Sequence, residues 1–96
     1  MLNSINIDGE IYSIKTFEDI NGNPYCILRL KIINTNKKRV TDVSLIDCFL
    51  YNENFKKCIK EFSKNDIVRV NGKLQKINTK NHTIKVFKIN KLKEIN

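Results

Sequence analysis

The sequence predicts an all-β fold, a five-stranded antiparallel barrel with one short helix between the third and fourth strands. Several segments alternate apolar and polar residues with period two, which is typical of strands with one buried face. One segment, near residue 55, has apolar residues at helical spacing instead. Two glycines interrupt the apolar rows of predicted strands, as the bends of a small closed barrel require. A closed barrel buries one core that five short strands in an open sheet cannot.

The length bounds the architecture. The chain has 96 residues, of which 41% are hydrophobic, and this suits one domain with one modest core. We therefore expect residues 1–96 to form a single domain, and the composition excludes a wholly disordered chain.

The first two predicted strands flank a turn. Ile5, Ile7 and Ile11 alternate with polar residues, and Gly9 takes the inward slot between them. Residues 21–24, Asn-Gly-Asn-Pro, form a dense turn signal. The strand over 25–34 should direct alternate side chains to opposite faces. One face carries Cys26, Leu28, Leu30 and Ile32, and the other carries Tyr25, Ile27, Arg29, Lys31 and Ile33.

The third strand and the helix follow a basic loop at 35–39. The strand over 40–51 should direct Ser44, Ile46, Cys48 and Leu50 to one face, and Val43, Leu45, Asp47, Phe49 and Tyr51 to the other. The helix then begins near Asn52 or Asn54, either of which could serve as its N-cap. Its apolar stripe consists of Phe55, Cys58, Ile59 and Phe62. Residues 63–66 end it.

A hairpin completes the chain. The fourth strand runs from 67 to about 76, with Val68, Val70 and Leu74 inward and Gly72 interrupting that row. Residues 78–81 form a turn. The fifth strand, 82–91, alternates less cleanly, so its facing stays open. This order and the position of the helix are typical of the OB-fold and argue against an SH3-like barrel, which normally lacks the helix.

The charge indicates a polyanionic partner. The formal net charge is +8. Residues 1–52 hold six basic and six acidic side chains, whereas residues 53–96 hold twelve and four. Such an excess favours nucleic acid or an acidic membrane surface. A merely solubilising surface is the alternative on charge alone.

Other classes of protein are disfavoured. No stretch has the 18 or more apolar residues of a membrane span, and residues 1–6 lack the pattern of a signal peptide. The cysteines Cys26, Cys48 and Cys58 stand far apart beside a single histidine, His82, so we expect reduced, buried thiols in a cytoplasmic protein with no metal and no cofactor. No arrangement of residues supports catalysis, and we expect a protein that is not an enzyme.

Three segments resemble the bacterial single-stranded DNA-binding protein (SSB) family. They are residues 5–11, residues 21–25 leading into 28–30, and above all residues 68–74, whose apolar-x-apolar-x-Gly-x-Leu pattern is similar to a strand of that family. The primosomal replication protein N is a close second, through residues 22–26 and overall length. The resemblance implies an OB-fold that binds single-stranded DNA as a homodimer or homotetramer.

The chain also departs from that family. It has no tryptophan, and Val43 stands where one of the family's base-stacking tryptophans would lie. Phe49 matches a phenylalanine that stacks on bases in the family. The sequence ends at residues 91–96 without the family's acidic tail, so we expect a short, tail-less member.

A single-strand site needs cations along the phosphates and flat rings for the bases. The outward rows of the predicted strands and two loops supply both, with Tyr51 as a further possible ring. The candidate binding residues are Tyr25, Arg29, Lys31, Lys37, Lys38, Arg39, Phe49, Arg69, Lys73, Lys76 and Lys80.

Several other residues are expected to lie outside the binding site. Phe55 and Phe62 are expected in the core, Tyr12 and Phe87 in the core or a subunit contact, and three helix lysines on its solvated face, namely Lys56, Lys57 and Lys60. Asp47 argues against the predicted binding face, and Asp8 with Glu10 indicates that the edge of the first strand meets a partner subunit. His82 is expected to be exposed.

The sequence therefore predicts binding of single-stranded DNA, without strong sequence preference, in replication, recombination or repair. Two alternatives stay open. One is a primosome or replication-restart accessory factor with replication proteins as partners, and the other is a protein–protein interaction module with no nucleic-acid role. RNA is not excluded as a ligand.

Overall fold

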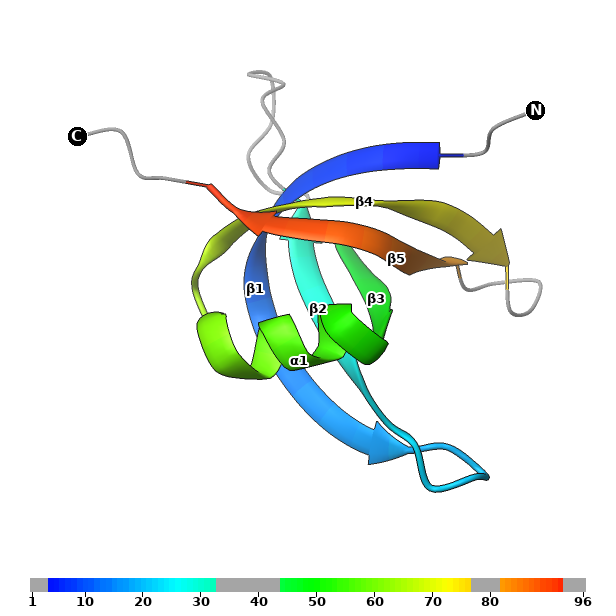
Figure 1. The fold of residues 1–96 in the computed structure, drawn as a ribbon. Helices are drawn as coiled ribbons and strands as arrows, with labels where there is room; N and C mark the ends of the chain where they lie inside the picture. Colours follow the sequence, from blue (N-terminus) through cyan, green and yellow to red (C-terminus); the bar gives the residue numbers. More distant parts are fainter. Residues whose placement is uncertain (1–3, 33–43, 77–81, 93–96) are drawn as a thin grey trace, which may run out of the picture.

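Five strands close into a barrel, and one helix covers an end of it (Figure 1). The computed structural model describes residues 4–32, 44–76 and 82–92. The elements in chain order are β1 (Ser4–Glu18), β2 (Pro24–Ile32), β3 (Leu45–Tyr51), α1 (Asn52–Glu61), β4 (Ile67–Lys76) and β5 (His82–Lys91). The strands follow one another around the barrel as β1-β2-β3-β5-β4, and β4 pairs again with β1. The predicted order of strands and the position of the helix are both confirmed.

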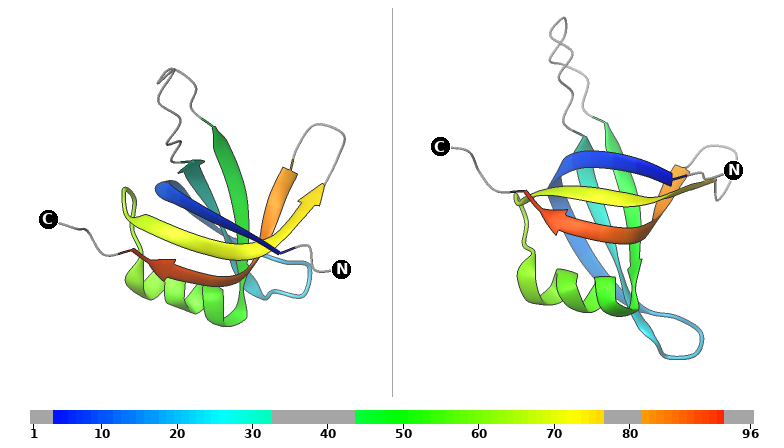
Figure 2. Two further views of the ribbon diagram at one scale, coloured as in Figure 1. Left: turned by 90° about the horizontal axis from the view of Figure 1, so that it is seen from above. Right: turned by 45° about the horizontal axis from the view of Figure 1, so that its top comes forward.

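Strand β1 pairs with two neighbouring strands, one along each half of its length. Its first half, Ser4 to Glu10, pairs with β4, and its second half, from Gly9 onwards, pairs with β2. The register shifts between Ile11 and Ser13, so the bend lies a few residues beyond Gly9. The strand curves through this point and crosses from one side of the barrel to the other (Figure 2).

Strands β3 and β5 are parallel neighbours, whereas the other adjacent strands are antiparallel. The chain leaves β3 through α1 and returns along β4 before β5 reaches the edge of β3. This pairing places Phe49 of β3 opposite Lys85 of β5.

The alternation of buried and exposed residues that the sequence predicts along β2 is confirmed. Cys26, Leu28 and Leu30 are fully buried, while Arg29 and Lys31 between them are exposed. The core around them comes from every strand and from α1; its fully buried members are Ile11, Cys26, Leu28, Leu30, Cys48, Leu50, Cys58, Val68, Val70, Ile84 and Ile89. All three cysteines are free and lie in this core, and burial raises the pKa of the Cys48 thiol to about 12.

The helix differs from its prediction at both the cap and the stripe. Tyr51 occupies the N-cap position and makes no side-chain cap hydrogen bond, so neither Asn52 nor Asn54 is the cap. Asn54 instead donates to the carbonyl oxygens of Val86 and Phe87 on β5, at 3.4 and 3.1 Å. Cys58 and Phe62 face the core, but Ile59 is 51% exposed. A ten-residue helix resting on a curved barrel end buries a stripe narrower than the sequence spacing indicated.

Other side-chain assignments need correction. Leu74 is 41% exposed, although the inward alternation of β4 continues as far as Gly72; the extra residue at the register shift is Phe87 of β5, so the shift does not change which way β4 faces. Tyr12 and Phe87 are about half exposed, so they do not lie in the core, and the other expected role, a subunit contact, stays a prediction. Lys57 is not simply solvated, since its Nζ lies 2.7 Å from the Ile89 carbonyl oxygen. His82 is exposed, as expected.

The close approach of β4 to β5 requires glycine at position 72. A Cβ there would lie 2.3 Å from the Lys85 carbonyl oxygen and 2.6 Å from Cγ2 of Ile84. Gly72→Ala is therefore expected to lower the free energy of unfolding by about 3 kcal/mol, because backbone must move to accept the methyl group. Urea unfolding monitored by circular dichroism measures this. Gly9→Ala, whose Cβ would lie 2.9 Å from the Lys31 carbonyl oxygen, should cost less, and an equal or larger cost at position 9 would contradict the argument.

In the described part of the chain, no helix is long and apolar enough to cross a membrane.

Candidate nucleic-acid interface

Four aromatic side chains gather on the outer face of β1, β2 and β3. Register places Phe17 opposite Tyr25, and Tyr25 opposite Tyr51, across three adjacent strands. The ring centroid of Tyr25 lies 5.6 Å from that of Phe17, 5.3 Å from that of Tyr51 and 6.2 Å from that of Phe49. The planes are within 12–26° of parallel in these pairs. We call Phe17, Tyr25, Phe49 and Tyr51 the aromatic ladder.

The ladder keeps much of its ring surface open to solvent. Phe17 is 42% exposed and Tyr51 is 36% exposed. A connected group of exposed aromatic rings is a candidate contact surface, because large exposed apolar patches often mark binding sites. Flat faces in near-parallel orientation suit ligands that stack.

Three lysines lie on a line of paired residues that runs around the barrel and includes Phe49 of the ladder. Lys15 pairs with Ile27, Ile27 with Phe49, Phe49 with Lys85, and Lys85 with Lys73, so these residues are successive neighbours on five strands. Lys15, Lys73 and Lys85 are all exposed. No carboxylate of the described residues lies within 4.0 Å of their Nζ atoms. We call these three side chains the lysine row, and their charge is available to an anion.

Arg29 occupies the same face, but Asp47 on β3 neutralises it. Arg29 Nε donates to Oδ1 of Asp47 at 2.7 Å, and a second nitrogen, Nη2, donates to Oδ2 at 3.2 Å. These hydrogen bonds, with the nearby negative charge, raise the pKa of the Arg29 guanidinium further above its ordinary value. The pair also lines a shallow depression together with Ser13, Lys15 and Phe17. Asp47 thus limits what Arg29 contributes to binding.

Removing that carboxylate charge should strengthen anion binding on this face. Asp47→Asn keeps the side-chain shape but frees the Arg29 guanidinium and removes a repulsive charge, so affinity for oligo-dT is expected to rise about threefold to tenfold at low salt. Fluorescence anisotropy titration measures it. Asp66→Asn, which removes the same charge from the turn after α1, is the control, and equal gains in the two variants would show a general effect of net charge.

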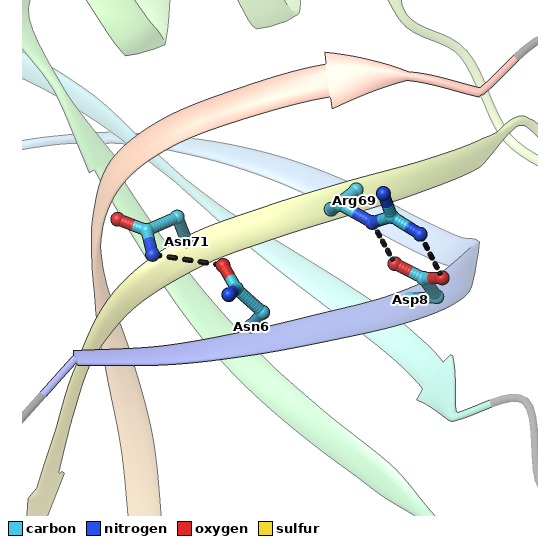
Figure 3. A network of polar contacts seen from close by, with 4 residues as sticks. All are labelled: Asn6, Asp8, Arg69 and Asn71. Carbon is cyan, nitrogen blue, oxygen red and sulfur yellow. Dashed lines mark hydrogen bonds and ion pairs between the residues drawn. The ribbon is translucent and has the colours of Figure 1, made fainter.

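Arg69 belongs to a different part of the surface. It forms a two-point ion pair with Asp8 across the β1–β4 seam, at 2.7 and 2.9 Å, and beside it Asn71 donates to Asn6 at 2.8 Å (Figure 3). The hydrogen bonds from Arg69 lower the pKa of the Asp8 carboxyl. Arg69 lies four residues along β4 from Lys73, about 13 Å at ordinary strand rise. The guanidinium therefore joins two strands of the barrel and already has an anionic partner.

The remaining predicted site residues divide into two groups. Lys31 is exposed at the end of β2 opposite Leu45, and Lys73 belongs to the lysine row. Lys76 ends β4 opposite His82, where only its backbone is described. Four cations predicted from the loops lie outside the described residues, namely Lys37, Lys38, Arg39 and Lys80.

The structure brings in three residues that the sequence-based list lacked, namely Phe17, Lys15 and Lys85. It also places Tyr51, the further possible ring, in the ladder. The position of Phe17 could have been predicted from the turn signal at 21–24, because a hairpin that closes at this turn sets Phe17 opposite Tyr25. Lys85 had no such signal, since its facing depends on the irregular register of β4 with β5.

No group of three or more potential metal ligands occurs among the residues that the structure describes.

No family model and no curated protein matches this sequence. Solved structures do match it over nearly the whole chain. The mitochondrial single-stranded DNA-binding protein Rim1 of S. cerevisiae superposes with a TM-score of 0.79 at 18% identity, covering 98% of this chain and 97% of Rim1. A small single-stranded DNA-binding protein of Streptomyces coelicolor gives a TM-score of 0.79 at 16% identity, covering 92% and 90%.

A third similar structure is the protein PriB of Ralstonia solanacearum. It gives a TM-score of 0.75 at 9% identity and covers 95% of this chain and 98% of its own. The closed barrel with a helix between β3 and β4 is thus an OB-fold, as the sequence predicted. Its structural neighbours include both kinds of protein that the sequence motifs resemble, SSB proteins first and PriB second.

Proposed function

We propose that this protein binds single-stranded DNA, without strong sequence preference, along the outer surface formed by the aromatic ladder and the lysine row. The observation that carries the proposal is the juxtaposition of the aromatic ladder with the lysine row, whose members have no described carboxylate within 4.0 Å. The chain has no tryptophan, so phenylalanine and tyrosine provide the stacking surface. No enzymatic activity is part of the proposal.

The two parts of the site act on different parts of the ligand. Bases of a single strand are unpaired and can stack on rings, each worth about 1–3 kcal/mol, and every base offers such a face. The lysines contact phosphates and release counterions, which makes affinity depend on salt but not on sequence. A base-paired duplex hides its base faces, so the ladder gives it no advantage. The arrangement therefore favours single strands over duplex.

The biological setting that fits is the protection of single strands during replication, recombination or repair. The names of the similar structures, two of them single-stranded DNA-binding proteins, support this setting. One OB-fold covers about 4–16 nucleotides, so we propose that the protein works in the cytoplasm as a homodimer or homotetramer whose barrels lengthen the track. The similarity to PriB supports a replication-restart accessory role as the second candidate.

Titration of labelled oligo-dT across a salt series tests the proposal. We expect binding that weakens steeply with salt, and weaker binding to a hairpin duplex of equal phosphate number. Affinity that barely changes with salt, or a preference for the duplex, would refute single-strand binding. Absence of binding even at low salt would favour a protein–protein interaction module, while weak DNA binding with capture of a restart helicase would favour the accessory role.

A further inference from the structure

A depression of about 440 Å³ lies at one end of the aromatic ladder. It lies among the β1–β2 turn, the start of α1 and the strands β4 and β5, and the residues that line it include Asp19, Asn23, Tyr51, Asn52, Gln75 and Lys85. Its volume falls within the range of about 300–1,000 Å³ that is typical of small-molecule sites. Two lining residues belong to the proposed interface, Tyr51 of the ladder and Lys85 of the lysine row. A nucleic-acid strand bound on the ladder would therefore lie next to this depression.

One wall of the depression carries a fixed carboxylate. Oδ1 of Asp19 accepts hydrogen bonds from the backbone N–H groups of Asn21 and Asn23, both at 2.8 Å. The Asp19 backbone N–H also donates to the Asn23 carbonyl oxygen at 2.9 Å. The hydrogen bond from the Asn23 backbone is the main cause that lowers the pKa of the Asp19 carboxyl. The group is thus ionised and held in place by its turn.

Lys85 lines the same depression as this carboxylate. The two groups line the same space, yet they form no ion pair within 4.0 Å. Asn52 and Gln75 also line the depression, and their amide side chains make no side-chain hydrogen bond to any other residue that the structure describes. Asn52 also adopts a left-handed backbone conformation, with φ of 51°, which asparagine tolerates better than most residues. The Asn52 and Gln75 side chains thus offer amide donors and acceptors that no described residue engages.

We propose that this depression receives one base of the bound strand and favours guanine. The inference rests on the proposed function, because the ladder must first hold a single strand. A carboxylate only accepts hydrogen bonds, and guanine presents adjacent donors, N1–H and the N2 amino group, along one edge. Guanine also presents acceptors, N7 and O6, which a lysine recognises. No other DNA base combines two adjacent donors with two adjacent acceptors in this way.

Thymine is the base that the depression should accept least. Its Watson–Crick edge has a single N–H donor between two carbonyl oxygens, and those oxygens would face the Asp19 carboxylate. Cytosine and adenine each offer an amino group but only one donor position on that edge. The ladder itself stays tolerant of sequence, so we expect a preference at one nucleotide position within an otherwise sequence-neutral track.

A substituted oligonucleotide series tests the inference with the unmodified protein. A 15-mer of dT with one central dG, long enough to slide until the guanine reaches the depression, should bind about five to ten times more tightly than plain dT15. Replacing the dG by deoxyinosine, which lacks the N2 amino group, should remove most of that gain. Replacing it by 7-deazaguanine, which lacks N7, should remove a smaller part. Equal affinity of dT15 and the dG-containing 15-mer would overturn the inference, whereas no binding of dT15 at all would overturn the proposed function.

A matched pair of variants locates the preference. Asp19→Asn keeps an oxygen that can accept the two turn hydrogen bonds but removes the charge, so the gain from dG should fall to less than twofold while dT15 still binds. Asp66→Asn removes an equal charge from another turn, where Asp66 Oδ2 accepts from the Ser63 N–H at 2.9 Å, and should keep the full preference. Loss of the preference in both variants, or in neither, would place it outside this depression. The wild-type nucleotide series decides the base preference even if Asp19→Asn fails to fold.

Discussion

Replacing Phe17 and Tyr51 together by alanine is expected to weaken binding of oligo-dT by at least about thirtyfold. These are the two ladder rings whose exposed faces can receive a base. Loss of one stacked base costs about 1–3 kcal/mol, so loss of two costs about 2–6 kcal/mol. Fluorescence anisotropy titration at fixed salt measures the change. Because phosphate contacts are untouched, the slope of log affinity against log salt should stay the same.

Two controls separate stacking from general damage. Tyr51→Phe keeps the ring and loses only the hydroxyl, so it should bind nearly as well as the unmodified protein. Phe87→Ala removes a ring on β5 that is 52% exposed. This ring takes part in none of the stacking contacts of the ladder. If Phe87→Ala weakens binding as much as the loss of a ladder ring does, bases do not stack preferentially on the ladder.

Replacing Lys73 and Lys85 together by alanine should change the salt dependence itself. Each phosphate contact on a single strand contributes about 0.7 to the slope of log affinity against log salt, so the slope should fall by about 1.4. Relative to about 1 M salt, counterion release raises the affinity at 50 mM salt by about 0.9 log units for each phosphate contact. The double variant, which loses two contacts, should therefore bind about 60-fold more weakly at 50 mM salt. The measurement is a titration at four or more salt concentrations.

The matched control removes two positive charges from the helix. Lys56 and Lys60 are exposed on α1, and Lys56 already has Glu53 as an ion-pair partner at 3.5 Å. Alanine at both positions gives the same net charge as the Lys73 and Lys85 variant. An equal fall in slope for the helix variant would mean that affinity follows net charge and not the lysine row.

Much of the fold was predictable because it depends on short-range patterns. The alternation along β2 settled which residues are buried, and the turn signals settled the bounds of β4 and β5. The length of β1 was not predictable in this way. Its alternation breaks at the register shift between Ile11 and Ser13, and after that shift the residues that would have extended the pattern change face.

The candidate site was less predictable because it depends on contacts between strands. Arg29 and Arg69 were both identified as exposed cations, but their partners Asp47 and Asp8 could be found only from the register. These carboxylates stand 18 and 61 positions away in the chain. Two of the arginines that looked most available for DNA are therefore already paired, whereas Lys85, whose facing the sequence left open, is unpaired among the described residues.

The double pairing of β1 also governs how the chain can fold. Residues 4–8 of β1 pair only with β4, and the paired residues Asp8 and Arg69 are 61 positions apart in the chain. On its other side, β4 is joined to β3 through β5. Barrels dominated by such distant pairings fold in milliseconds to seconds, because a long loop must close before any contact repays its entropy. During synthesis the first half of β1 must wait as an unpaired edge until β4 has left the ribosome. The seam between β1 and β4 is thus expected to form last in refolding, and its amides should be the slowest of the barrel to gain protection from hydrogen exchange.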